Sequence, residues 1–291
     1  MAGSLTVAMA RRVGIDRLRG AGIAEETLRA DVDHLLCHVL AQNPTWLMTW
    51  PEAELAGEDC TAFETALARR AGGEPVAHIT GERGFWTLSL ATDRSTLIPR
   101  ADTETLIEAV LETLADKRAA PLELADLGTG TGAIALALAS ECPAWRVCGV
   151  DREAAAVTLA QHNAERNGLN GVSFLQGDWE APLADHSLDI LVSNPPYIRP
   201  DDPHLVQGDV RFEPHTALVA AEDGLADLRH LIHAGTRVLR TGGWIFLEHG
   251  FDQAEDVALL LIDAGYQTLG QRRDLGGNPR VTFGQRPLRI L

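Results

Sequence analysis

A four-residue motif, Asn194-Pro195-Pro196-Tyr197, follows a short apolar run at Ile190–Val192 and carries groups suited to chemistry on a planar nitrogen. An amide nitrogen is a poor nucleophile because its lone pair is delocalised, so a catalyst must orient it. The Asn194 side-chain oxygen and the Pro195 carbonyl could each accept one N–H of the target. The prolines stiffen the loop, and the π face of Tyr197 could stabilise positive charge developing on nitrogen. We interpret Asn194, Pro195 and Tyr197 as catalytic and all four residues as substrate-binding.

A glycine-rich loop precedes a predicted helix and is the second chemical motif. Close approach of a backbone to a ligand requires residues without a Cβ. The spacing is G-x-G-x-G, which differs from the G-x-G-x-x-G of dinucleotide enzymes and from the phosphate-binding G-x-x-x-x-G-K-[ST] loop, and so favours S-adenosylmethionine. A loop of this kind can also simply connect a strand closely to a helix. The residues assigned to the cofactor are Gly128, Thr129, Gly130, Thr131 and Gly132.

Three further residues, at or just after the ends of the next two predicted strands, could complete the cofactor site. Asp151 ends one strand, where a carboxylate can accept hydrogen bonds from ribose hydroxyls. Asp178 could accept from the exocyclic amine of adenine, and Trp179 could cover the ring face. Taken alone, Asp178 could equally be a turn residue.

The elements that must position these motifs alternate between strand and helix from Thr103 onward, which is typical of an α/β fold with a parallel sheet covered on both faces. Helices are expected to begin near Thr103, Gly132, Glu153, Gly224 and Gln253. Apolar runs predict strands at 122–126, 146–151, 172–176, 189–193 and 244–248, and a final antiparallel pair at 266–271 and 280–284. Both motifs then fall at the carboxyl edge of the sheet, where open α/β folds bind ligands.

The chain before this sheet has a different pattern. Apolar residues recur at helical spacing from about residue 4 to residue 72. We therefore expect a helical domain at 1–72, a connector with a short β-hairpin at 73–100, and the catalytic domain at 101–291. Because the helical domain carries no catalytic motif, we expect it to recognise the substrate.

Composition restricts the cellular setting. The net charge is -16, and no basic stripe compensates, so direct nucleic-acid binding is not expected. The start lacks a leader pattern and no apolar run approaches a membrane span, so we expect a cytoplasmic protein without a membrane partner. We expect neither disulfides nor a metal site, because no C-x-x-C spacing occurs among Cys37, Cys60, Cys142 and Cys148.

With these motifs in place, the chain resembles the peptide chain release factor glutamine methyltransferases, which modify the glutamine of a Gly-Gly-Gln tripeptide in translation termination factors. The resemblance spans nearly the whole chain, although His78 stands where many relatives have tyrosine. Further similar stretches are Gly73-Glu74-Pro75, Leu97-Ile98-Pro99-Arg100 with Thr103-Glu104, and Arg211-Phe212-Glu213-Pro214 followed by Ala217-Leu218.

This resemblance implies a seven-stranded Rossmann-like methyltransferase sheet with a small N-terminal helical domain. It implies transfer of a methyl group from S-adenosylmethionine, leaving S-adenosylhomocysteine, to the N5 side-chain nitrogen of a release-factor glutamine. It also implies that residues 128–132, Asp151, Trp179 and Asn194 contact S-adenosylmethionine, while residues 194–197 hold the glutamine. Asn194 would then serve both ligands.

Other interpretations are open at this point. A ribosomal-protein glutamine methyltransferase would share both motifs. An enzyme that methylates exocyclic amines of nucleic-acid bases uses a related tetrad, but the acidic composition counts against it. The glycine spacing opposes a nicotinamide dehydrogenase, and a non-catalytic scaffold would leave the tetrad unexplained.

Overall fold

The computed structural model describes residues 5–288, which form two compact units. One unit comprises the described chain up to Glu82 together with His204–Phe212, and the other comprises Arg83–Pro203 together with the described chain from Glu213 onward. Each unit has its own buried apolar cluster. Among these residues, no helix is both long enough and apolar enough to cross a membrane.

The first unit is helical, as the spacing of apolar residues predicts. Two of its helices begin at side-chain caps: Thr6 Oγ1 accepts from the backbone of Met9 at 3.3 Å and Asn43 Oδ1 accepts from that of Trp46 at 2.8 Å. The helices are α1 (Val7–Gly20), α2 (Leu28–Leu40), α3 (Pro44–Thr49), α4 (Gly57–Ala71) and α5 (Val76–Thr80).

A buried arginine ties the distant segment His204–Phe212 to these helices. Arg70 on α4 is only 6% exposed. Its Nε donates to Asp31 at 2.7 Å and its Nη1 donates to Asp209 at 2.8 Å. The 3₁₀ turns η3 (Pro203–Val206) and η4 (Gly208–Phe212) cover most of this segment. No local sequence pattern indicates this association, because the paired residues are 139 positions apart.

The second unit contains the sheet, and its seven strands confirm the predicted fold class. Their order is β5-β4-β3-β6-β7-β9-β8; neighbours from β5 to β7 are parallel, and β9 is antiparallel to both β7 and β8. Strand β7 begins at Leu239, earlier than the predicted start at residue 244. The reason is that Leu239 also pairs with Leu188 of β6, and an irregularity in the register separates this pair from the main ladder that starts at Ile190 and Trp244. The strands are β3 (Glu123–Leu127), β4 (Arg146–Asp151), β5 (Ser173–Gln176), β6 (Leu188–Ser193), β7 (Leu239–Glu248), β8 (Gln267–Arg273) and β9 (Pro279–Gln285).

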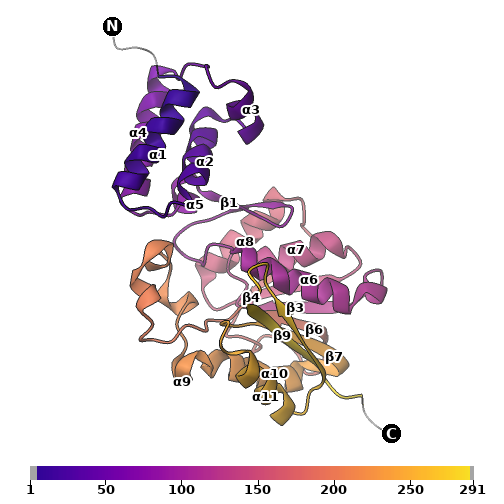
Figure 1. Ribbon diagram of the computed structural model, residues 1–291. Helices are drawn as coiled ribbons and strands as arrows, with labels where there is room; N and C mark the ends of the chain where they lie inside the picture. The colour runs from indigo at the N-terminus through magenta and orange to yellow at the C-terminus, as the bar shows by residue number, and fades with distance from the viewer. Residues whose placement is uncertain (1–4, 289–291) are drawn as a thin grey trace. The chain divides into compact units, whose positions relative to one another are not determined.

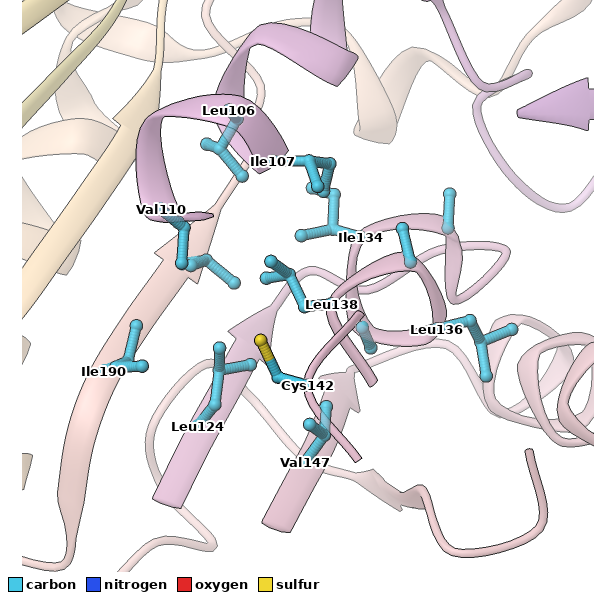
Figure 2. Packing of buried hydrophobic residues seen from close by; sticks show 14 of the residues in the cluster. Leu106, Ile107, Val110, Leu124, Ile134, Leu136, Leu138, Cys142, Val147 and Ile190 are labelled. Atoms are coloured by element: carbon cyan, nitrogen blue, oxygen red, sulfur yellow. The ribbon is translucent and has the colours of Figure 1, made fainter. Parts of the chain in front are cut away.

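Helices cover both faces of this sheet (Figure 1). On one face lie α6 (Glu104–Thr113), α7 (Ala133–Glu141) and α8 (Ala154–Arg166); on the other lie α10 (Ala226–Val238) and α11 (Ala254–Asp263). Figure 2 shows part of the first layer, where aliphatic side chains of α6 and α7 meet those of β3, β4 and β6. Such burial contributes about 1.5–3 kcal/mol per large side chain, so it stabilises the packing of these helices on the sheet. The labelled residues include Leu106, Val110, Leu124, Leu138, Val147 and Ile190.

The region expected to connect the domains begins with a helix. Residues 76–80 form α5, which starts after Pro75 and ends at Gly81, whose φ is 74°. A proline before a helix and a glycine at a left-handed C-cap are both typical boundary residues. The expected hairpin follows as β1 (Glu82–Phe85) and β2 (Leu88–Ala91). The remaining short elements are η1 (Ala101–Thr103), η2 (Ala115–Lys117), η5 (His215–Ala217) and α9 (Ala221–Gly224).

Candidate active site

A cavity of about 360 Å³ lies beside the carboxyl ends of β3, β4 and β6. This volume is within the range that small-molecule sites occupy. The structure brings most of the sequence-predicted residues together in its wall and leaves Gly132, Pro195 and Tyr197 outside the lining. The predicted residues that line the cavity are Gly128, Thr129, Gly130, Thr131, Asp151, Asp178, Trp179, Asn194 and Pro196.

The glycine loop turns sharply over the end of β4. Gly128 and Gly130 have φ values of 74° and 53°, a region that disfavours side chains. The Gly130 backbone N–H donates to Asp151 Oδ2 at 2.9 Å, and the Glu153 N–H donates to Asp151 Oδ1 at 3.0 Å. Each carboxylate oxygen therefore keeps a further lone pair for a ligand hydroxyl. Asp151 thus both orders the loop and presents acceptors to the cavity.

Gly132 has a different position from the other loop residues. It is the N-cap of α7 with a φ of 81°, and its N–H donates to the Thr129 carbonyl at 2.8 Å. A Cβ at this position would lie 3.2 Å from side-chain atoms of both Ala160 and Phe174. Gly132 therefore allows the helix to pack closely on its neighbours.

Trp179 lies against the glycine loop. A Cβ on Gly128 would be 3.2 Å from Trp179 Cζ3, so the bare backbone at Gly128 makes room for the indole. Asp178 and Asp227 both line the cavity nearby. Burial raises the pKa of Asp227, and the charge of Asp178 contributes in the same direction. An aromatic ring next to acceptor groups can hold a flat, amine-bearing ring.

The Asn194 side chain lies in the cavity wall, where it forms a hydrogen bond with a neighbouring side chain. Its Nδ2 donates to the Thr103 hydroxyl at 3.2 Å, and both residues line the cavity. Pro196 lines the cavity as well, whereas Pro195 is buried. Behind them, the Tyr197 hydroxyl donates to Glu248 Oε1 at 3.4 Å. Burial strongly raises the pKa of Tyr197, so the phenol stays neutral.

Several lining residues were missed by sequence reasoning. Thr96 lines the cavity and is 3% exposed, and its buried hydroxyl has no hydrogen-bond partner among residues 5–288. An orphaned buried hydroxyl in a cavity wall is expected where a polar ligand completes the bonding. The segment His215–Ala217 and Val219 also contribute. Their only signal in the sequence is their place within or beside stretches that carry the resemblance.

A second buried carboxyl lies beneath the loop. Asp126 is fully buried; Oδ2 accepts from the Thr129 hydroxyl at 2.7 Å and from the Ala135 backbone at 3.3 Å. Burial raises the pKa of Asp126 to about 7. It supports the loop from below and does not line the cavity. No group of three or more His, Cys, Asp or Glu residues able to hold a metal occurs within the described chain.

Comparison with known proteins agrees with this architecture. Residues 9–81 match the family model described as PrmC N-terminal domain, and residues 101–207 match the methyltransferase small domain. The release factor glutamine methyltransferase of Vibrio cholerae is 49% identical over 285 residues, which cover 97% of this chain and 97% of that protein. That of Escherichia coli is 48% identical over 262 residues, covering 90% and 94%.

The chain belongs to the release factor glutamine methyltransferase family. The resemblance inferred from the motifs is thereby confirmed, and the protein is a methyltransferase. Among solved structures, the hMettl16 catalytic domain in complex with the MAT2A 3'UTR hairpin 6 has a TM-score of 0.55 at 16% identity, covering 78% of this chain and 83% of that one. That likeness concerns the fold alone.

Proposed function

We propose that this protein transfers a methyl group from S-adenosylmethionine to the side-chain N5 nitrogen of the glutamine in the Gly-Gly-Gln motif of peptide chain release factors. The observation that carries the proposal is that Asn194 and Pro196 line the same cavity as the glycine loop and Asp151. The proposed amide acceptor Asn194 and a cofactor cradle are therefore adjacent, as a direct transfer between two bound ligands requires.

The cavity residues fit S-adenosylmethionine. The positive φ angles at Gly128 and Gly130, together with the orphaned Thr96 hydroxyl, provide a close backbone approach and a free polar contact. Asp151 would accept from the ribose hydroxyls, while Asp178 and Trp179 would hold the adenine. When bound, the cofactor supplies an electrophilic methyl carbon carried on a sulfonium.

The tetrad would bind and orient the glutamine amide. Because Asn194 Nδ2 already donates to Thr103, its Oδ1 is the atom left to accept from the target NH2 group. The Pro195 carbonyl would accept the second N–H. With both protons directed at oxygen acceptors, the nitrogen lone pair faces away from them. The ring of Tyr197, anchored through its hydroxyl to Glu248, is assigned to stack on the amide plane.

The decisive experiment offers methyl-labelled S-adenosylmethionine and three acceptors: a purified release factor, a ribosomal-protein mixture and total RNA. The proposal expects label on the release factor, lost when the glutamine of its tripeptide is changed to alanine. A matched control changes a glutamine elsewhere on the release-factor surface and should retain the label. Label confined to ribosomal protein or to RNA would refute the proposal and identify the acceptor class instead.

A further inference from the structure

The cavity wall contains a carboxylate, that of Asp227, to which no role has been given so far. Asp227 is the second residue of α10 and is partly buried, and it lines the cavity together with Asp178 and Trp179. Its side chain forms no hydrogen bond or ion pair within residues 5–288, and the same is true of the Asp178 side chain. A carboxylate that is partly withdrawn from water and has no donor is expected where a ligand supplies one.

Contacts between α10 and the segment after β5 place Asp227 at the same end of the cavity as Trp179. The centroid of the His230 ring lies 6.3 Å from that of Trp179. His230 Nε2 also lies 2.9 Å from Oε2 of Glu180, the residue that follows the tryptophan. Asp227 precedes His230 by three residues, so both side chains project from one face of the helix. Asp227 therefore lies next to the segment that carries Asp178, as their shared place in the cavity lining also indicates.

The charge of the cavity wall favours a ligand group that donates hydrogen bonds. Among the described residues, four carboxylates and one guanidinium line the cavity. The guanidinium is that of Arg152, which is half-exposed and lies 3.5 Å from a Glu153 oxygen. Burial raises the pKa of Asp227, the charges of Arg152 and His230 oppose that rise, and the charge of Asp178 adds to it. An N–H donor would be attracted to this wall, and an acceptor would be repelled.

The adenine of the proposed cofactor carries a donor of this kind. Its exocyclic amine has two N–H groups in the plane of the ring, so two acceptors are needed to satisfy both. Asp178 is assigned to one of them. Asp227 comes from a different element beside the same aromatic ring and can take the other. A ring with a carbonyl oxygen in place of the amine would present an acceptor to two carboxylates, which is unfavourable.

We propose that Asp227 is a specificity-determining residue of the cofactor site, which accepts the second N–H of the adenine amine and so selects adenine over a purine that carries an oxygen there. This inference rests on the proposed function, in which the cavity binds S-adenosylmethionine with its adenine against Trp179. It gives Asp227 no part in methyl transfer.

The test compares two ligands by calorimetry. One is S-adenosylhomocysteine, and the other is S-inosylhomocysteine, in which a carbonyl oxygen replaces the exocyclic amine. The wild-type protein should bind the adenosyl compound at least about 100-fold more tightly, because the inosyl compound leaves two acceptors unpaired. Equal affinities in the wild-type protein would overturn the inference, and that result requires no variant.

Asp227→Asn separates the contribution of this residue from that of Asp178. Asparagine keeps the shape and can turn its NH2 group toward a carbonyl oxygen. Adenosyl binding should therefore weaken about 10-fold and inosyl binding should not, so the ratio of the two Kd values should fall by about 10-fold or more. An unchanged ratio would overturn the inference. General damage to the fold would weaken both ligands alike, and so it would not produce the expected change in the ratio.

Asp256→Asn is the matched control. Like Asp227, Asp256 is an acidic residue in the first turn of a helix, but it is exposed and lies on α11 outside the cavity lining. This variant makes the same change in net charge, and its Kd ratio should equal that of the wild type. The same fall in both variants would show a general charge effect and would overturn the role of Asp227.

The two proposals can fail separately. Calorimetry needs no methyl acceptor, so it tests Asp227 even if the release factor is not methylated. If the protein bound neither ligand, the cofactor assignment would be refuted together with this inference. Tight and equal binding of both ligands would overturn this inference alone.

Discussion

Arg100 Nη2 donates to both carboxylate oxygens of Glu213, at 2.8 Å each. The Glu213 side chain is fully enclosed, and its Oε1 also accepts from the Ile98 backbone at 3.2 Å. Two segments that line the cavity, around Leu97 and around His215, are thereby held together. Arg100, which belongs to one of the stretches that carry the family resemblance, therefore forms an ion pair in the structure.

Replacing Glu213 should therefore weaken both the fold and the site. Glu213→Ala leaves the buried Ile98 N–H and the half-exposed Arg100 without this partner, which should cost about 2 kcal/mol of unfolding free energy. We expect a raised KM for the cofactor in addition. Denaturant unfolding and initial rates measure the two effects. The control is Glu112→Gln, which breaks an exposed pair with Arg272 and should change stability by less than about 1 kcal/mol.

The glycine loop offers a matched comparison of backbone strain and crowding. Gly128 and Gly168 have similar φ values of 74° and 70°. A Cβ at Gly128 would lie 3.2 Å from Trp179, whereas a Cβ at Gly168 would point into open space. Alanine at either position should cost about 1 kcal/mol of stability. Only Gly128→Ala should also reduce cofactor affinity, as measured by calorimetry. Equal affinity losses in both variants would contradict the proposed contact between loop and ligand.

Asp151 should govern cofactor affinity. Asp151→Ala removes the ribose acceptor and releases the Gly130 N–H, so the Kd for S-adenosylmethionine should rise on the order of 10-fold or more. Asp185→Ala, which removes an exposed partner of Arg237, serves as the control and should leave the Kd unchanged. An unaltered Kd in Asp151→Ala would exclude the ribose contact.

Asn194 should instead govern the chemical step. Asn194→Ala deletes the proposed amide acceptor and should cost on the order of 2–4 kcal/mol of transition-state stabilisation, the scale of one preorganised polar group. Cofactor binding should stay largely intact. Single-turnover rates at saturating substrate, together with calorimetry, separate the two quantities. Unchanged turnover would remove Asn194 from the mechanism.

Asp126 should make stability depend on pH. Its pKa is raised from 3.8 to about 7 in the folded state, so the unfolded chain ionises first as pH rises. This contribution to stability is fully present below about pH 4 and is lost progressively up to about pH 7. Asp126→Asn cannot ionise, so its stability relative to wild type should improve as pH rises across that window, by up to about 4 kcal/mol. Denaturant unfolding at pH 4 and pH 8 measures the change, and a pH-independent difference would contradict it.

The sequence by itself determined the sheet, the two motifs and their common edge. Short apolar runs predict each strand from β3 to β9, because a strand buried on both faces is apolar along its length, and the helices between them show helical spacing because they bury one face. Parallel strands place their carboxyl ends together, so the sequence predicts the glycine loop, Asp151 and Asn194 at one edge of the sheet.

Only the tertiary structure decided which residues support those motifs. Asn194 bonds to Thr103 across 91 positions, Arg100 to Glu213 across 113, and Arg70 to Asp209 across 139. A hydrogen bond between such distant residues leaves no periodic trace in the chain. Its existence depends on how helices and loops pack after the sheet has formed.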